Sequence, residues 1–401
     1  MFMSKLNDNV KIAIVSAHFI RNLGYQEVRL ADSFYKLGYK TKVFTSTAKS
    51  NASKNNKLIK DTNEKLYGVL RLKPIVSIGS KVIVKGLLKK ISEYNPDFVI
   101  VIGAAKLFPN TIFFKKGFNK YKIISVFSDC SEYQKNISLF KKLFFKSSHK
   151  IIKKLIYNKV VIKSDRIILN SEDTVRTFTS FIKKKNIQIL NNKKKLFKLG
   201  FDPDLFFYDP KLRAKKRKEI TLNEKDHLIV TCTRVIREKE LETVVDVISE
   251  LILKPKQNLK YIIIGLENDK YSKSFANYVS SQKAKDNIIL MPFLNHKEIN
   301  EYYCASDIGI WSKGAIPIQE SMGTGLPIIT KDKKTVSHII KPMSNGIYYN
   351  DKNLKLVIEQ MLTFKNDKNS IFHIRNRERL VEKNSRDMSY RTIAKNMISN
   401  L

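Results

Sequence analysis

Two cations and one carboxylate are the residues of this 401-residue chain whose types and spacing favour a chemical role. Arg234 and Lys239 lie in the segment "RVIREKEL", which follows the apolar run "HLIVTCT". Ligands of open α/β sheets bind at the carboxyl ends of the strands, so both side chains are expected at such an edge. Two fixed cations there suit a diphosphate. The alternative for a basic pair of this kind is a solvated surface position.

The carboxylate is Glu320, in the stretch "IPIQESMGTGLPIIT" at 316–330. Proline just inside a helix and glycine just past its end predict a helix from about Pro317 to Thr324, followed by a strand at 327–330. The start of that helix offers free N–H groups and a positive dipole end to a phosphate. Glu320 is then placed to accept hydrogen bonds from a ribose diol, although a lone glutamate in a first turn is usually a dipole partner.

Two α/β domains are predicted to position these residues. At 43% hydrophobic residues the chain can fill two cores, each of about 150–200 residues. "NVKIAIVSAH", "QEVRLADSFYKLG" and "YKTKVFTS" read as strand, helix and strand, and further strands are expected at 97–103, 122–128 and 166–171. "KLGFDPDLFFYDP" is a connector, after which the alternation restarts and runs to about residue 378. This order predicts parallel, doubly wound sheets.

The net charge of +38 favours an anionic partner, although over-use of Lys, Asn and Ile also indicates compositional drift. Segment 141–166 is rich in lysine and carries apolar residues at near-helical spacing, as a helix on an anionic membrane surface does. The alternative is a core-facing helix with a solvated basic back. No apolar run approaches the roughly 18 residues of a membrane span, and the first residues do not read as a secretory signal. We therefore expect a cytoplasmic protein, peripheral at the inner face of the membrane.

The same motifs, in this order, resemble those of the GT-B glycosyltransferases of family 4 type, the glycosyl transferases group 1. "KLGFDPDLF" resembles the interdomain motif G-x-D-x-x-x-F, and "TRVIREKEL" resembles the phosphate loop G-R-L-x-x-x-K-G. "ASDIGIW…IQESMGTGLPIIT" resembles A-D-x-x-x followed by E-A-M-A-x-G-x-P-V-I, and "MSYRTIAKNMI" resembles a helix that crosses back to the first domain. "WSKGAIPIQES" resembles a subgroup of surface-polysaccharide enzymes.

The resemblance implies the GT-B fold, in which two Rossmann-like domains face each other across a cleft. Residues 1–200 would form the acceptor-side domain, 201–378 the nucleotide-sugar-binding domain, and 379–401 a helix packing back on the first. It implies a retaining enzyme that moves a hexosyl or related sugar from a UDP- or GDP-sugar to a lipid-linked or cell-surface glycan in polysaccharide biosynthesis. No metal is expected, since the six histidines and three cysteines show no metal-ligand spacing and the fold holds the diphosphate with cations and a helix end.

Roles follow from the resemblance residue by residue. The catalytic set would be Asp129, Arg234 and Lys239. The donor would be bound by Arg234 and Lys239 together with Gly24, Gly314, Ala315, Ile316 and Glu320. The acceptor side would be lined by His18, Glu132 and Tyr133.

The chain departs from the family pattern at three positions. Ser312 stands where the family often has a first glutamate, so the carboxylate that would hold the donor sugar is missing or another group replaces it. Thr233 and Glu240 stand in place of the two glycines of the phosphate loop.

Three other functions compete with a glycosyltransferase. A nucleotide-sugar epimerase or hydrolase on this fold would need several acid and base groups around the sugar. Asp129 and His18 are the only two candidates for such groups. A basic nucleic-acid-binding protein would need a recognisable module, and none is present, so no nucleic acid partner is expected. An inactive scaffold would have lost the phosphate-binding cations, which are kept.

Overall fold

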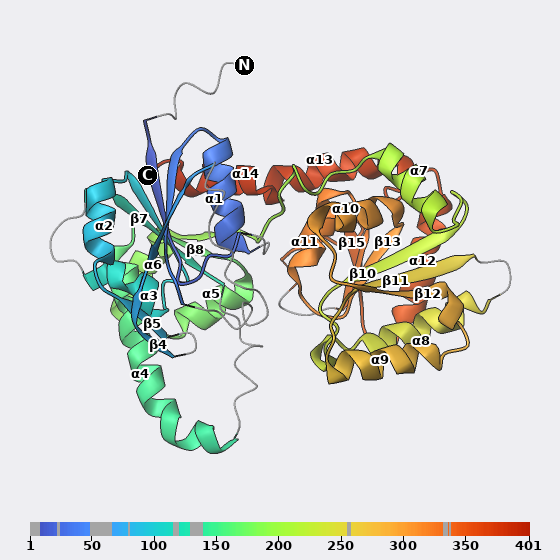
Figure 1. The fold of residues 1–401 in the computed structure, drawn as a ribbon, viewed down its shortest axis with the longest axis horizontal. Coiled ribbons are helices and arrows are strands. Elements are labelled where there is room, and N and C mark those ends of the chain that lie inside the picture. The colour runs from blue at the N-terminus through green and yellow to red at the C-terminus, as the bar shows by residue number, and fades with distance from the viewer. Residues whose placement is uncertain are drawn as a thin grey trace. The chain divides into compact units, whose positions relative to one another are not determined.

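The structure is a computed structural model that describes residues 9–21, 25–48, 66–78, 81–114, 120–128, 139–254, 258–331, 336 and 338–401. For residues 78 and 139–150 it describes the backbone alone. The chain divides into two compact units (Figure 1). The first comprises Met1–Lys198 and Tyr390–Leu401, and the second comprises Leu199–Ser389. The sequence placed the division two residues later, after residue 200.

The first unit is built on a parallel sheet whose strand order is β3-β2-β1-β6-β7-β8-β9. The strands are β1 (Lys11–Val15), β2 (Lys40–Ser46), β3 (Gly68–Leu72), β6 (Phe98–Ile102), β7 (Lys122–Phe127), β8 (Arg166–Leu169) and β9 (Lys194–Leu196). A separate antiparallel hairpin pairs β4 (Pro74–Ile78) with β5 (Lys81–Val84). The helices are α1 (Gln26–Lys36), α2 (Leu87–Tyr94), α3 (Leu107–Asn110), α4 (Leu139–Lys163), α5 (Glu172–Thr179), α6 (Ile187–Lys193) and α14 (Tyr390–Ile398).

Both faces of this sheet are buried, because successive strand residues point to opposite sides. Ile12 and Ile14 of β1 join the apolar cluster that α1 and α14 cover. Ala13 and Val15 join the opposite cluster, to which α2, α4, α5 and α6 contribute. The strands consequently read as continuous apolar runs, which is the pattern from which the parallel sheet was predicted.

The second unit repeats this design with the strand order β12-β11-β10-β13-β14-β15, again parallel. Its strands are β10 (His227–Cys232), β11 (Leu259–Leu266), β12 (Ile288–Pro292), β13 (Ile308–Trp311), β14 (Ile328–Lys331) and β15 (Gly346–Tyr349). Its helices are α7 (Pro210–Glu219), α8 (Leu241–Ile252), α9 (Lys270–Ser280), α10 (His296–Ala305), α11 (Ile316–Gly323), α12 (Leu354–Asn366) and α13 (Arg377–Met388). Helices α8, α9 and α12 pack on one face, and α10 and α11 on the other (Figure 1). The predicted α/β fold with two parallel-sheet domains is confirmed.

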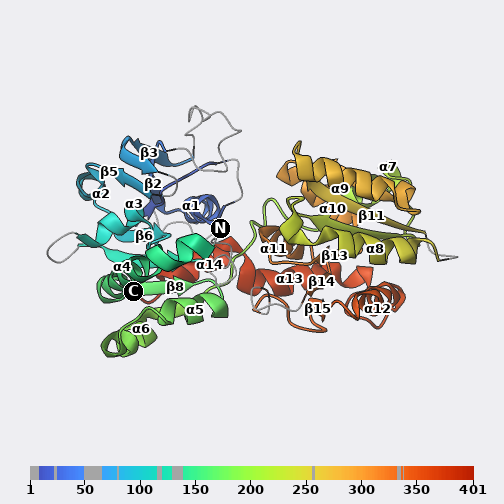
Figure 2. The ribbon, with the colours of Figure 1, turned by 90° about the horizontal axis from the view of Figure 1, so that it is seen from below.

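The C-terminal stretch differs from the single crossing helix expected at 379–401. It forms two helices, because Ser389 adopts an extended backbone with φ −71° and ψ 137° between them. Helix α13 packs on α11 within the second unit, where Leu380 and Met388 are buried. Helix α14 lies beside α1 in the first unit (Figures 1 and 2). The Arg166 guanidinium fixes its end by donating to the carbonyls of residues 396 and 397, at 3.0 and 2.8 Å.

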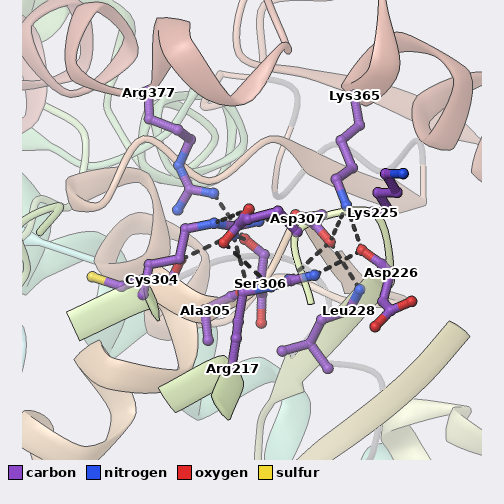
Figure 3. Close-up of polar contacts among 12 residues, drawn as sticks. Arg217, Lys225, Asp226, Leu228, Cys304, Ala305, Ser306, Asp307, Lys365 and Arg377 are labelled. Carbon is purple, nitrogen blue, oxygen red and sulfur yellow. Dashed lines mark hydrogen bonds and ion pairs between the residues drawn. The ribbon is translucent and has the colours of Figure 1, made fainter. Parts of the chain in front are cut away.

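A buried charge cluster, shown in Figure 3, holds the second unit together at the amino ends of β10 and β13. The Asp307 carboxylate lies 2.8 Å from Arg213 Nη2, 3.3 Å from Arg217 Nη1 and 3.1 Å from Lys365 Nζ. It also accepts a hydrogen bond of 2.9 Å from the N–H of Leu228. Burial alone would raise the pKa of Asp307, but the three cations hold it well below its usual range. The carboxylate is therefore charged in the folded protein.

Candidate functional site

The loops that follow β10 and β13 are joined at the carboxyl edge of the second sheet. Lys239 Nζ donates to the carbonyl of Gly314 at 3.2 Å, and the Ser312 hydroxyl donates to the carbonyl of Lys239. Gly314, Ala315 and Ile316 lead from this contact into α11, with Ala315 as its N-cap. The structure therefore brings Lys239 to the start of the helix that sequence analysis assigned to phosphate.

Arg234 lies in the loop that follows β10, as Lys239 does, but next to the end of β11. Its Nε is 3.1 Å from Glu267 Oε1, and its side chain is 53% exposed. The close approach of the two loops depends on Gly265, where φ is +122° and a Cβ atom would meet the carbonyl oxygen of Thr233 at 2.1 Å. Only glycine fits there. Glu267 thus orients a guanidinium that still faces solvent.

Helix α11 begins and ends within one residue of the prediction, and Gly325 stops it with φ +67°. Glu320 is only 7% exposed and lies near Cys232 and Tyr303. Burial raises the pKa of the Cys232 thiol to about 12, and the negative charge of Glu320 adds to this. Glu320 is thus an almost fully buried carboxyl group between the end of β10 and helix α10, whereas glutamate side chains are usually solvated.

His18 follows β1 at the carboxyl edge of the first sheet. Its Nδ1 lies 3.1 Å from the carbonyl of Ala48. Burial and the nearby charge of Lys106 lower the pKa of His18, against the effect of that carbonyl. A neutral imidazole is therefore favoured at this position.

Glu27 is a candidate that sequence analysis did not identify. It lies in the first turn of α1, at the same edge as His18 and near Lys106 in the turn after β6. Burial raises the pKa of Glu27 from 4.5 to about 7, while its own backbone N–H and Lys106 act in the opposite direction. Strongly perturbed acids mark functional sites more often than ordinary surfaces do. The sequence signal was a single acidic residue at a helix start, which is too common to single out.

The raised pKa of Glu27 predicts a dependence of stability on pH. The folded protein keeps the Glu27 proton up to about pH 7, whereas the unfolded chain releases it near 4.5. The stabilisation of the folded protein by this proton is complete below pH 4.5 and is lost as the pH rises through 7. We expect Glu27→Gln to be more stable than the unmodified protein at pH 8, by about 1–3 kcal/mol, with the advantage vanishing towards pH 4.5. Urea unfolding at several pH values measures it, and an advantage independent of pH would contradict it.

The other predicted site residues lie outside the described residues. These are Gly24, Asp129, Glu132 and Tyr133. In the part of the chain that the structure describes, no cluster of three or more His, Cys, Asp or Glu side chains is arranged to hold a metal ion. Within the same residues, no helix has both the length and the apolar character needed to span a membrane.

Comparisons with known proteins agree with this architecture. Residues 213–387, which lie within the second unit, match the family model described as Glycosyl transferases group 1. No curated protein matches the chain.

Solved structures match over nearly the whole length. Sucrose-phosphate synthase from Thermosynechococcus elongatus has 14% identity and a TM-score of 0.67, with 97% of each chain covered. HepE from Anabaena in complex with UDP-glucose has 13% identity and a TM-score of 0.65, covering 96% of this chain and 98% of HepE. WaaG, a glycosyltransferase involved in lipopolysaccharide biosynthesis, has 14% identity and a TM-score of 0.66, covering 97% of this chain and all of WaaG. The fold is that of the GT-B glycosyltransferases.

Proposed function

We propose that this protein is a retaining glycosyltransferase of family 4 type that transfers a sugar from a nucleoside diphosphate sugar to a glycan. The observation that carries the proposal is the joining of Lys239 to Gly314 at the start of α11, in a domain that matches the glycosyl transferases group 1. The complex of the structural neighbour HepE with UDP-glucose supports a UDP-sugar as donor. A GDP-sugar is the alternative donor.

The chemistry would rest on stabilising the diphosphate as it leaves the sugar. Arg234, Lys239 and the N–H groups at the start of α11 would surround the growing negative charge, and Glu320 would hold the ribose. In such sites electrostatic stabilisation of the developing charge is usually the largest contribution to the rate. The acceptor hydroxyl would attack from the face that the diphosphate leaves. No metal is needed for this arrangement.

The first unit would supply the acceptor side. In the proposal Gly24 allows close approach of the backbone to the substrate, and Asp129 faces the reacting sugar. His18, Glu132 and Tyr133 line the acceptor site, and Glu27 joins them because it lies at the same sheet edge as His18. The acceptor is a lipid-linked or cell-surface glycan, and involvement of WaaG in lipopolysaccharide biosynthesis supports this choice.

A panel of nucleotides tests the proposed function. UDP, GDP, CMP and their sugars are added to the protein, and the melting temperature is measured for each. A ligand that binds only the native state raises the melting temperature according to its affinity. We expect one nucleoside diphosphate and its sugars to stabilise the protein, and the absence of any shift would exclude this function.

The surface of α4 supports a membrane-bound acceptor. Ile151, Ile152, Leu155 and Ile162 are between 53% and 60% exposed, while Tyr157, Val160 and Val161 face the core. Lys154 is exposed beside them, and Lys159 covers the ring of Phe114, whose side chain is 63% exposed. Apolar residues among lysines suit the surface of an anionic bilayer. The helix therefore has one side that faces the core and a second apolar side in solvent. The core-facing helix considered from the sequence is thus present, but its solvent side is apolar as well as basic.

Vesicle binding tests the membrane proposal. We expect the protein to bind vesicles that contain anionic lipid, and this binding to weaken as the salt concentration rises. Lys153→Gln and Lys154→Gln should each weaken it by about 1 kcal/mol for a lysine that touches the surface. Leu155→Ser should weaken it as well.

Leu356→Ser is the matched control, because Leu356 is 66% exposed on α12 of the second unit. It should leave vesicle binding unchanged. Equal binding to neutral vesicles, or none to anionic ones, would remove the membrane from the proposal. If the protein binds anionic vesicles as expected, we propose that it acts at the cytoplasmic face of a membrane.

A further inference from the structure

Glu240 adopts a left-handed backbone conformation, with φ +48° and ψ +42°, between Lys239 and the first residue of α8. Residues other than glycine are uncommon in this region, and Asn and Asp tolerate it better than glutamate. Strain of this kind persists where the surrounding structure enforces it, and it gathers at ligand-binding sites. A glycine at this position would relieve the strain. The backbone conformation therefore does not explain why a glutamate is present, and its side chain is expected to have a separate role.

The Glu240 carboxylate is held by two lysines from neighbouring strand ends. Oε1 lies 3.0 Å from Nζ of Lys313, which follows β13, and Oε2 lies 3.2 Å from Nζ of Lys331, the last residue of β14. The Glu240 side chain is 40% exposed, compared with 28% for Lys313 and 19% for Lys331. The carboxylate is thus fixed in orientation and still open to solvent.

This carboxylate lies in the loops of the proposed donor site. Its neighbour Lys239 contacts Gly314, and the carbonyl of Lys239 accepts the hydroxyl of Ser312. The Ser312 side chain, only 4% exposed and already used in this contact, is poorly placed to bind a sugar. Glu320 is almost fully buried, and Glu267 pairs with Arg234. Glu267 is also fixed and is 35% exposed, but it follows β11. Of these carboxylates, Glu240 is the one in the loops after β10 and β13 that is both fixed and partly exposed.

We propose that Glu240, oriented by Lys313 and Lys331, accepts hydrogen bonds from hydroxyl groups of the donor sugar. A carboxylate accepts through both oxygens and the ammonium group of Lys313 donates, so this pair offers both halves of a hydroxyl's hydrogen bonding. Lys331, which also lies 2.5 Å from Asp351 Oδ1, holds the carboxylate in place. Its ligand is the neutral polyhydroxylated ring of a nucleotide sugar. The inference rests on the proposed function, and it assigns recognition of the sugar to a residue separate from those that bind the nucleotide.

Glu240→Gly tests this inference, because it removes the carboxylate and also relieves the backbone. The dissociation constants of UDP, GDP, UDP-glucose, UDP-galactose, UDP-N-acetylglucosamine and GDP-mannose are measured by calorimetry. We expect the affinity of the variant for the nucleoside diphosphate to stay within about twofold, while its affinity for the preferred nucleotide sugar falls by about tenfold or more. Its melting temperature should equal or exceed that of the unmodified protein.

Thr221→Gly is the matched control. Thr221 also has a left-handed backbone, with φ +58°, and it follows α7 in the same unit, away from the proposed donor site. The control should gain stability in the same way and keep the full affinity for the sugar. Glu240→Gln, which loses its charge, should fall between the glycine variant and the unmodified protein.

The possible failures are distinguishable. If the unmodified protein binds no nucleotide, the proposed function fails. If it binds nucleotides but Glu240→Gly binds the nucleotide sugar as tightly as before, the proposed function stands and Glu240 is only a structural ion pair. The same conclusion follows if no sugar adds affinity to its nucleoside diphosphate in the unmodified protein.

Discussion

Replacing Glu320 with alanine is expected to weaken the binding of a nucleoside diphosphate by about tenfold or more, because each charge-assisted hydrogen bond to a ribose hydroxyl contributes about 1.5–3 kcal/mol. The loss should be about equal for the monophosphate and the diphosphate, since both carry the ribose. Calorimetric titration of the folded variant measures it. Glu320→Gln keeps the shape of the side chain and should show a smaller loss.

The control for this prediction is a glutamate in the first turn of a different helix. Glu172 opens α5 in the first unit and is exposed. If Glu320 only complements a helix dipole, Glu320→Ala and Glu172→Ala will both change stability and neither will change nucleotide affinity. A Glu320→Ala protein that folds normally and binds every nucleotide as before would place the nucleotide elsewhere.

The fold was predictable because its signals are local and repeated. The strands of both sheets are continuous apolar runs, and the helix containing Glu320 is bounded by Pro317 and Gly325. A final helix was expected in "MSYRTIAKNMI", where α14 lies, but its start was placed too early, at residue 379, because no proline or glycine separates this segment from α13. Only packing shows that Met388 belongs to the second unit and Tyr390 to the first.

The residues of the candidate site that belong to sequence motifs could be named in advance, whereas the contacts between its loops could not. Arg234, Lys239 and Glu320 could be named because their spacing matches a known pattern. The pairing of Glu240 with Lys313 and Lys331 could not, since it joins loops up to 91 residues apart. Glu27 was missed for a different reason, because its raised pKa depends on burial that appears only when the chain is folded.

The largest effect on stability is expected from Asp307→Asn. The Asp307 side chain is 1% exposed, and Arg213, Arg217 and Lys365 around it are 2% to 7% exposed. The amide keeps the shape and can still accept from the Leu228 N–H, so the substitution removes mainly the charge. Breaking a buried ion pair from one side costs about 3–5 kcal/mol, because the remaining charges stay buried without compensation. Urea unfolding followed by circular dichroism should show this loss for the second unit.

Two comparisons make the Asp307 prediction specific. Asp387→Asn removes an ion pair in which Asp387 is 58% exposed and Lys341 is 59% exposed. This substitution should change the free energy of unfolding by no more than about 1 kcal/mol. Adding Lys365→Met to Asp307→Asn removes one of the uncompensated cations and should recover part of the loss, which a double-mutant cycle measures. The pKa of Asp307 is lowered by folding, so its contribution is present above the ordinary pKa of 3.8 and is lost as the pH falls below it. An Asp307→Asn protein as stable as the unmodified one at pH 7 would mean that the surrounding cations are solvated rather than buried.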